Sequence, residues 1–206
     1  MICPPEDCAL CPRLVAMRMQ VNETHPDYHA APVRPFGPRD ARLLVVGLAP
    51  GLHGANATGR PFSGGGAGDL IYRTLYDFAF ASVPLSKGPG DDLELFDCRI
   101  TNTVKCLPPN NKPVAAELNA CSRFLRYELE TPTVLVALGA IAHKAVIRTL
   151  RLRQKDYGFA HAAQHALESG QTLIDSYHCS RYNLNTGRLS PRMFAQVFAA
   201  ARDHLA

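Results

Sequence analysis

The chain has 206 residues, which suggests a single domain with a sizeable core. Hydrophobic residues make up 47% of it and charged residues 19%, a balance that excludes a disordered chain. The net charge of +4 permits nucleic-acid binding without requiring it, so phosphate contacts would come from a local basic cluster. No apolar run is long enough to span a bilayer, and the N-terminus lacks a signal-peptide core. We therefore expect a cytoplasmic protein with reduced thiols.

Predicted strands and helices alternate along the chain. Residues 1–40 are rich in proline and cysteine, contain one predicted short helix at 13–20, and need an anchor to the rest. Beyond them, short apolar runs predict buried strands at 42–47, 99–104, 133–138 and 172–177, and helical spacing predicts helices at 67–82, 113–130, 139–150 and 191–205. This alternation predicts an α/β fold with a mostly parallel sheet. Ligands bind at the carboxyl ends of such strands, which favours the loops after residues 47 and 177.

The first of these loops, residues 48–66, is rich in glycine. It could cradle a phosphate at a helix N-terminus, although it lacks the Lys-Ser/Thr ending of a P-loop and the spacing of a dinucleotide fingerprint. Alternatively, it is a long turn that only connects two elements. His53, Asn56, Arg60 and Phe62 are side chains able to contact a ligand, and they favour a functional loop.

The second loop, residues 176–188, is dense in hydrogen-bonding groups. His178 directly follows a predicted strand, although a single histidine is more often structural than catalytic. Arg181, Arg188 and Arg192 could contact phosphates, and Tyr182 or Leu184 could insert as a wedge into a base stack.

The cysteines suggest a metal site. The pattern Cys8-x2-Cys11 places two thiolates within reach of one metal, and Cys106 and Cys121 could complete a shell of four. The second pair lacks the Cys-x2-Cys spacing of a zinc ribbon, but zinc remains a competitor to an iron–sulfur cluster. The alternative is that Cys106 and Cys121 are small buried hydrophobic residues.

Four motifs occur in a characteristic order: GLAPG (47–51), HGANATGRPF (53–62), ITNTVKC (100–106) and SYHCSRYNLNTGRL (176–189). Together with the four cysteines, they resemble the uracil-DNA glycosylases of family 5. The resemblance implies a three-layer α/β/α sandwich around a four-stranded, mostly parallel sheet. It also implies a [4Fe–4S] cluster whose ligands are Cys8, Cys11, Cys106 and Cys121. The cluster would tie residues 1–40 to a single domain that spans residues 1–206.

The activity implied by the resemblance is hydrolysis of the N-glycosidic bond of flipped-out uracil, and of other deaminated or modified bases, in DNA. Asn102 and His178 would be catalytic: Asn102 would hydrogen-bond the uracil edge, and His178 would face the base O2 atom. Phe62 would stack on the flipped base. The partner would be damaged DNA, with no membrane and no nucleotide cofactor, and the enzyme would be a cytoplasmic monomer that meets the nucleoid during repair.

The implied site includes further residues. The substrate-binding set is Gly47, Leu48, Ala49, Pro50, Gly51, His53, Asn56, Phe62, Ser63, Gly65, Asn102 and His178. The DNA-binding set is Ser180, Arg181, Tyr182 and Arg188.

One position departs from the family pattern. Many members carry Asp where this chain has Gly65, and the nearest carboxylate, Asp69, is expected in the first turn of a helix. The enzyme would then work without that carboxylate. Two alternatives are a lesion-binding protein with weak or lost catalysis and, from the glycine-rich loop and the mild net charge alone, a zinc-stabilised nucleotide-binding module.

Overall fold

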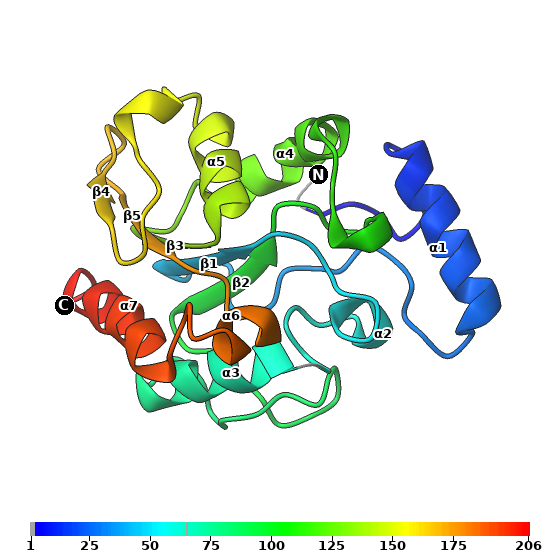
Figure 1. Ribbon diagram of the computed structural model, residues 1–206, viewed down its shortest axis with the longest axis horizontal. Coiled ribbons are helices and arrows are strands. Elements are labelled where there is room, and N and C mark those ends of the chain that lie inside the picture. The colour runs from blue at the N-terminus through cyan, green and yellow to red at the C-terminus, as the bar shows by residue number, and fades with distance from the viewer. Residues whose placement is uncertain (1–2, 65) are drawn as a thin grey trace.

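A five-stranded sheet forms the centre of the computed structural model, which describes residues 3–64 and 66–206 (Figure 1). The strands are β1 (Leu43–Gly47), β2 (Cys98–Asn102), β3 (Val134–Leu138), β4 (Gln164–Ala166) and β5 (Thr172–Ser176), in the order β2-β1-β3-β5-β4. β1 pairs in parallel with β2 and β3, and β3 pairs in parallel with β5. The prediction of an α/β fold with a mostly parallel sheet is confirmed.

The expected number of four strands is wrong by one. The additional strand, β4, pairs antiparallel with β5 at the edge of the sheet. It comprises only Gln164, His165 and Ala166, and this short, largely polar segment gives no apolar run by which a strand is recognised.

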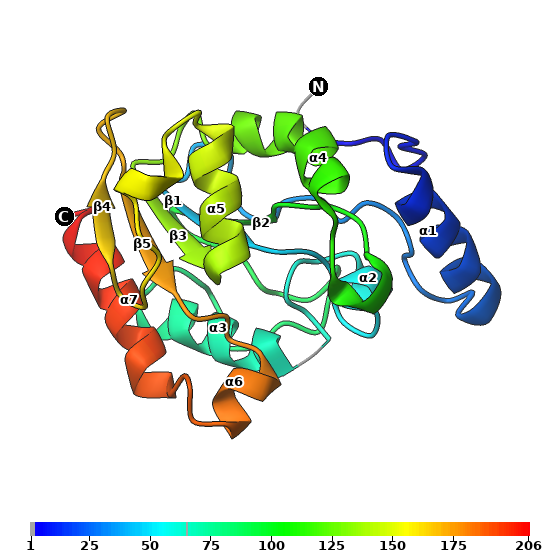
Figure 2. The same cartoon turned by 45° about the horizontal axis from the view of Figure 1, so that its top comes forward.

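Helices cover both faces of the sheet, as Figures 1 and 2 show. In β1, Leu43 and Val45 enter one core cluster, whereas Leu44 and Val46 enter another. The first cluster includes side chains of α3 (Gly66–Asp77) and α7 (Pro191–Asp203), and the second includes side chains of α4 (Ala115–Glu128) and α5 (Ala140–Thr149). Both faces of the strands are therefore buried, as in a three-layer α/β/α arrangement.

The remaining elements are shorter or lie outside these layers. They are α1 (Pro12–Thr24), α2 (Ala55–Thr58), α6 (Arg181–Asn185) and the 3₁₀ turns η1 (Pro109–Asn111) and η2 (Gln154–Asp156). In both views α1 lies apart from the sheet, beyond α2 (Figures 1 and 2). α2 and α6 occur inside the two loops that the sequence marks as functional. No helix within the described ranges is both long and apolar enough to cross a membrane.

Helix α3 ends earlier than its apolar spacing predicts. The expected helix extends to residue 82, but α3 stops at Asp77. Ala79 adopts a left-handed conformation with φ of 56°, and the Phe80 N–H donates to the Leu75 carbonyl at 2.7 Å. A left-handed residue with such a backward hydrogen bond is a usual helix stop.

The core makes a direct stability prediction. The Phe198 ring is fully buried in α7, with its centroid 5.1 Å from that of Phe194. We expect Phe198→Ala to lower the free energy of unfolding by about 3–5 kcal/mol, measured by urea denaturation, because it removes a large buried group and leaves a cavity. The control Met19→Ala, at an exposed side chain, should change it by about 0.5 kcal/mol or less. A loss at Phe198 as small as that of the control would contradict this packing.

Candidate active site

A cleft of about 650 Å³ opens beside the carboxyl ends of β2 and β5 and the loop after β1. The chain continues from β1 toward β2 at one edge of the sheet and from β3 toward β4 and β5 at the other, so the direction reverses between β1 and β3, and ligands bind at such a switch point. The lining residues are Leu48, Ala49, Gly51, Leu52, His53, Gly54, Ala55, Phe62, Ser63, Gly64, Gly66, Ala67, Gly68, Asn102, Asn111, His178, Ser180 and Arg181.

The cleft brings together most of the predicted site residues. The predicted substrate-binding residues in its lining are Leu48, Ala49, Gly51, His53, Phe62, Ser63, Asn102 and His178, joined by Ser180 and Arg181 from the predicted DNA-binding set. Gly47, Pro50, Asn56, Tyr182 and Arg188 are not in the lining, and Gly65 lies outside the described residues. Asn111, in η1, is a lining residue that sequence reasoning missed, because no motif marks it.

Gly47, the last residue of β1, is the point where two site residues meet. A methyl group at this position would overlap Oδ1 of Asn102 and would lie 2.7 Å from Cζ of Phe62. Asn102, paired with Gly47 in the sheet register, is the last residue of β2. Only glycine allows both side chains to approach the strand end this closely.

Phe62 has a strained backbone that its neighbours hold in place. Its φ is 58°, a left-handed conformation that is unfavourable for a bulky side chain. The buried Tyr72 hydroxyl donates to the Pro61 carbonyl at 2.5 Å, and Gly68 lets α3 approach the Phe62 carbonyl, which a Cβ there would overlap. The Phe62 ring is stacked with that of His178, with centroids 6.0 Å apart and planes 30° apart.

His178 and Asn102 are two of the hydrogen-bonding residues that line the cleft. Burial lowers the pKa of His178 below its usual value of 6.5, so the imidazole is neutral at pH 7 and can donate one N–H. The Asn102 residue is only 4% exposed, and its backbone carbonyl accepts a hydrogen bond from the buried Lys105 Nζ atom at 2.6 Å. Within the described residues that line the cleft there is no carboxylate. Asp69 is exposed in the first turn of α3, as expected.

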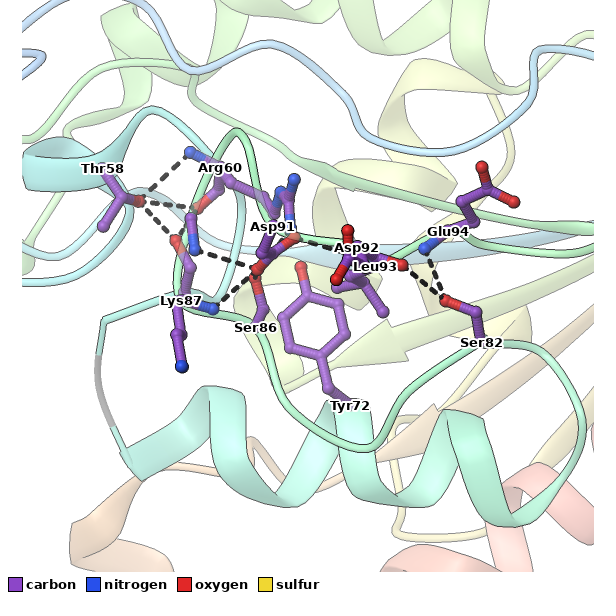
Figure 3. Close-up of polar contacts among 12 residues, drawn as sticks. Thr58, Arg60, Tyr72, Ser82, Ser86, Lys87, Asp91, Asp92, Leu93 and Glu94 are labelled. Atoms are coloured by element: carbon purple, nitrogen blue, oxygen red, sulfur yellow. Dashed lines mark hydrogen bonds and ion pairs between the residues drawn. The ribbon is translucent and has the colours of Figure 1, made fainter.

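Arg60 does not contact the cleft, contrary to the prediction for this residue. Its side chain is 8% exposed, forms an ion pair with Asp91 and donates to the Ser86 hydroxyl at 3.0 Å (Figure 3). Its guanidinium also lies 4.3 Å from the centre of the Phe36 ring. The backbone N–H of Lys87 donates to the same Asp91 carboxylate at 2.7 Å. Arg60 therefore links the glycine-rich loop, residues 48–66, to the loop between α3 and β2.

Asn56 is also directed into the protein. It is 1% exposed, and among the described residues its Nδ2 atom forms no hydrogen bond. The backbone carbonyl of Asn56 accepts a hydrogen bond from the Ala30 N–H at 3.0 Å, which connects the glycine-rich loop to the N-terminal segment.

The four predicted metal-binding cysteines line one small cavity. Cys8 and Cys11 come from the N-terminal segment beside α1, Cys106 follows β2, and Cys121 lies in α4. Burial raises the pKa of the Cys106 thiol to about 12 and is also the largest cause of the raised pKa values of Cys11 and Cys121. A nearby cationic group or metal is therefore needed to stabilise the thiolates.

The charges around this cavity suit thiolates. Arg18 lines it, as does Lys105, whose pKa is lowered by burial, and no carboxylate belongs to its described lining. Arg18 donates to the Cys8 carbonyl at 2.6 Å, and Leu14 of α1 packs in one cluster with Phe124 of α4. The cysteine cavity thus lies where the N-terminal segment meets the core.

Comparison with known proteins identifies the class of this site. The sequence model of the Uracil DNA glycosylase superfamily matches residues 34–202, so the chain belongs to this superfamily. A type-5 uracil-DNA glycosylase from Thermus thermophilus is 44% identical over 203 residues, which cover 95% of this chain and 92% of the relative. One from Pyrobaculum aerophilum is 38% identical over 201 residues, covering 95% and 88%. A type-4 enzyme from Thermotoga maritima is 38% identical over only 109 residues, 52% of this chain. The chain belongs to the type-5 uracil-DNA glycosylase family.

The ion pair of Figure 3 predicts an acid-dependent stability. Burial raises the pKa of Asp91, but hydrogen bonds from Arg60 and three backbone N–H groups lower it by more. The net result is a pKa of about 2, compared with the usual 3.8. A depressed carboxyl pKa contributes stability that is complete above pH 3.8 and is lost as the pH falls through about 2. We expect Asp91→Asn to lower the melting temperature at pH 7 and to approach the wild type near pH 2. A difference that does not depend on pH would contradict this interaction.

Proposed function

We propose that this protein removes uracil from DNA by hydrolysing the N-glycosidic bond. The observation that carries the proposal is the convergence of Phe62, Asn102 and His178, from three separate segments, on one cleft. An aromatic ring, an amide and a neutral imidazole are the groups that stack on a planar base and hydrogen-bond its edge. The printed names of the type-5 relatives support uracil as the base.

The base reaches the cleft only after it has flipped out of the DNA duplex, because a stacked base inside the duplex is inaccessible to the enzyme. Arg181 lies against Gly66 at the N-terminus of α3, where a methyl group would be 3.0 Å from the Arg181 Cγ atom. A guanidinium beside a helix N-terminus is a favourable place for a DNA phosphate. Tyr182, 72% exposed in α6, would insert into the stack as a wedge, with Ser180 and Arg188 contacting the backbone nearby.

Bond cleavage leaves the electron pair on the base, and the sugar becomes electron-poor. The neutral His178 donates its N–H to the oxygen on which negative charge develops, and the Asn102 amide fixes the base edge. Removing one such donor typically costs on the order of 2.7–4 kcal/mol of transition-state stabilisation. Water then forms a bond to the electron-poor carbon of the sugar, and the proton that it loses neutralises the departing base. Catalysis in this scheme rests on stabilising the leaving base, because the described lining of the cleft has no carboxylate.

The absence of a carboxylate from that described lining also favours a second candidate function, a lesion-binding protein with weak or lost catalysis. We propose hydrolysis as the main function. We also propose that the substrates include other deaminated or modified bases, because an aromatic ring such as that of Phe62 can stack on any planar base. The enzyme would act as a monomer without a nucleotide cofactor, in the cytoplasm and at the nucleoid during repair.

We further propose that Cys8, Cys11, Cys106 and Cys121 hold a [4Fe–4S] cluster. Support comes from the shared cavity and from the cationic Arg18 in its lining, which suits an anionic cluster with four thiolates. The cluster would serve as a structural link that joins residues 1–40 to one domain.

Uracil release tests the proposed activity. We expect the wild type to release uracil from uracil-containing DNA, and His178→Ala to lower the single-turnover rate on the order of 10²–10³-fold. His204→Ala, at an exposed histidine distant in sequence from the cleft residues, is the matched control and should keep the wild-type rate. Full activity in His178→Ala would contradict its role. An inactive wild type that binds damaged DNA, rescued by Gly65→Asp, would favour the lesion-binding alternative.

Metal analysis tests the cluster. We expect anaerobically purified protein to contain iron and inorganic sulfide in equal amounts, and Cys121→Ser to lose them because it removes a ligand. Cys3→Ser should retain both, since Cys3 does not line the cavity. Stoichiometric zinc without iron would contradict the cluster.

A further inference from the structure

A buried polar cluster lies on the α5 side of the sheet, separate from the residues that line the cleft. Asp175 of β5 accepts hydrogen bonds from two histidines, His143 of α5 and His165 of β4. The distances are 2.7 Å from His143 Nδ1 to Oδ1 and 3.1 Å from His165 Nε2 to Oδ2. The side chains are 2%, 14% and 0% exposed for His143, His165 and Asp175. Both oxygens of one buried carboxylate are therefore occupied by imidazoles.

The contacts of His143 show that the His143–Asp175 pair holds one proton more than a neutral imidazole beside a carboxylate. Its Nε2 atom lies 2.9 Å from the carbonyl oxygen of Tyr157, which can only accept a hydrogen bond. Its Nδ1 atom faces the carboxylate, so both ring nitrogens point at oxygen atoms. Satisfying both contacts requires an imidazolium beside a carboxylate, or the same proton moved onto Asp175. In either state a charge-assisted or short hydrogen bond joins α5 to β5.

The groups that face His143 favour its protonated form. Burial lowers its pKa, but the hydrogen bond and negative charge of Asp175 outweigh this effect, and the pKa is raised above 6.5. The other neighbours are His165 from β4, the Tyr157 carbonyl after η2, and the Phe159 ring, whose centroid is 5.7 Å away. Lys144, on the same helix, acts in the opposite direction with a smaller effect.

The cluster connects directly to the residue that donates to the base. Asp175 is the second-last residue of β5, and the next residue, Ser176, accepts a hydrogen bond from the Gly139 N–H at 2.7 Å. Gly139 is the N-cap of α5, and a methyl group on it would lie 3.7 Å from the His178 Cβ atom. Helix α5 and strand β5 therefore meet where the chain turns to present His178 to the cleft.

We propose that Asp175, held between His143 and His165, is a positioning residue that fixes the end of β5 and so the imidazole of His178. The inference rests on the proposed function and deepens it. A displacement of about 1 Å at a catalytic group can reduce a rate by about 10²-fold. The carboxylate thus acts on catalysis through the backbone of β5, without contacting the substrate.

Asp175→Asn tests the proposal, because it keeps the shape of the side chain and removes its charge and one acceptor. We expect kcat for uracil release to fall by about tenfold or more with little change in KM, and the His178 ring resonances to shift in NMR spectra. The matched control is Gln171→Leu at the opposite end of β5. The Gln171 amide is also buried, donating to the Leu129 and Pro132 carbonyls at 2.9 and 2.7 Å. This control should lose stability while keeping kcat and the His178 resonances.

His165→Gln provides a second variant at the edge of the sheet, where folding is less at risk, and should give a smaller change of the same kind. Wild-type kcat and unshifted His178 resonances in Asp175→Asn would overturn the proposal, as would equal effects in Gln171→Leu. Stoichiometric zinc that is lost in His143→Gln would also overturn it, because the cluster would then be a metal site. If the wild type releases no uracil, the proposed function fails, whereas the NMR comparison still tests Asp175.

Discussion

The close approach of two side chains to Gly47 is the constraint on which the rest of the site depends. β1 lies at the switch point of the sheet, and its last residue has no side chain to separate Asn102 from Phe62. Asn102 arrives there because β2 is in register with β1, and His178 arrives because β5 runs parallel on the other side of β3. The cleft is thus a consequence of strand order combined with one glycine.

Much of the protein serves to hold two loops in shape. A left-handed Phe62 is unfavourable by roughly 1–3 kcal/mol, and contacts from outside the loop offset this. Tyr72 binds the preceding carbonyl, and Arg60 pairs with Asp91 in the neighbouring loop. The N-terminal segment adds a further contact through the Asn56 carbonyl. Anchoring this segment at the cysteine cavity would therefore support the glycine-rich loop, so the proposed cluster would act on the cleft only through this contact.

The sequence allowed the layers to be predicted because buried strands and amphipathic helices have distinct periods. β4 and the two short helices α2 and α6 were missed, since a few polar residues carry no period. The prediction that Arg60 contacts a ligand is wrong because its true partner, Asp91, lies in another loop. The sequence of a loop does not show whether an arginine in it binds a substrate or a carboxylate of the protein. The cluster of His143, His165 and Asp175 left no local signal, because its members come from three elements that only the fold brings together. The family resemblance implies the roles of Asn102 and His178, and the convergence of these residues on one cleft supports those roles.

A crystal structure with DNA that contains a non-hydrolysable deoxyuridine analogue would show where the base binds. We expect the flipped uracil to lie in the cleft, stacked on Phe62, with its edge on the Asn102 amide and its O2 atom facing His178. A base bound outside this cleft, or one that remains stacked in the duplex while the cleft is empty, would contradict it.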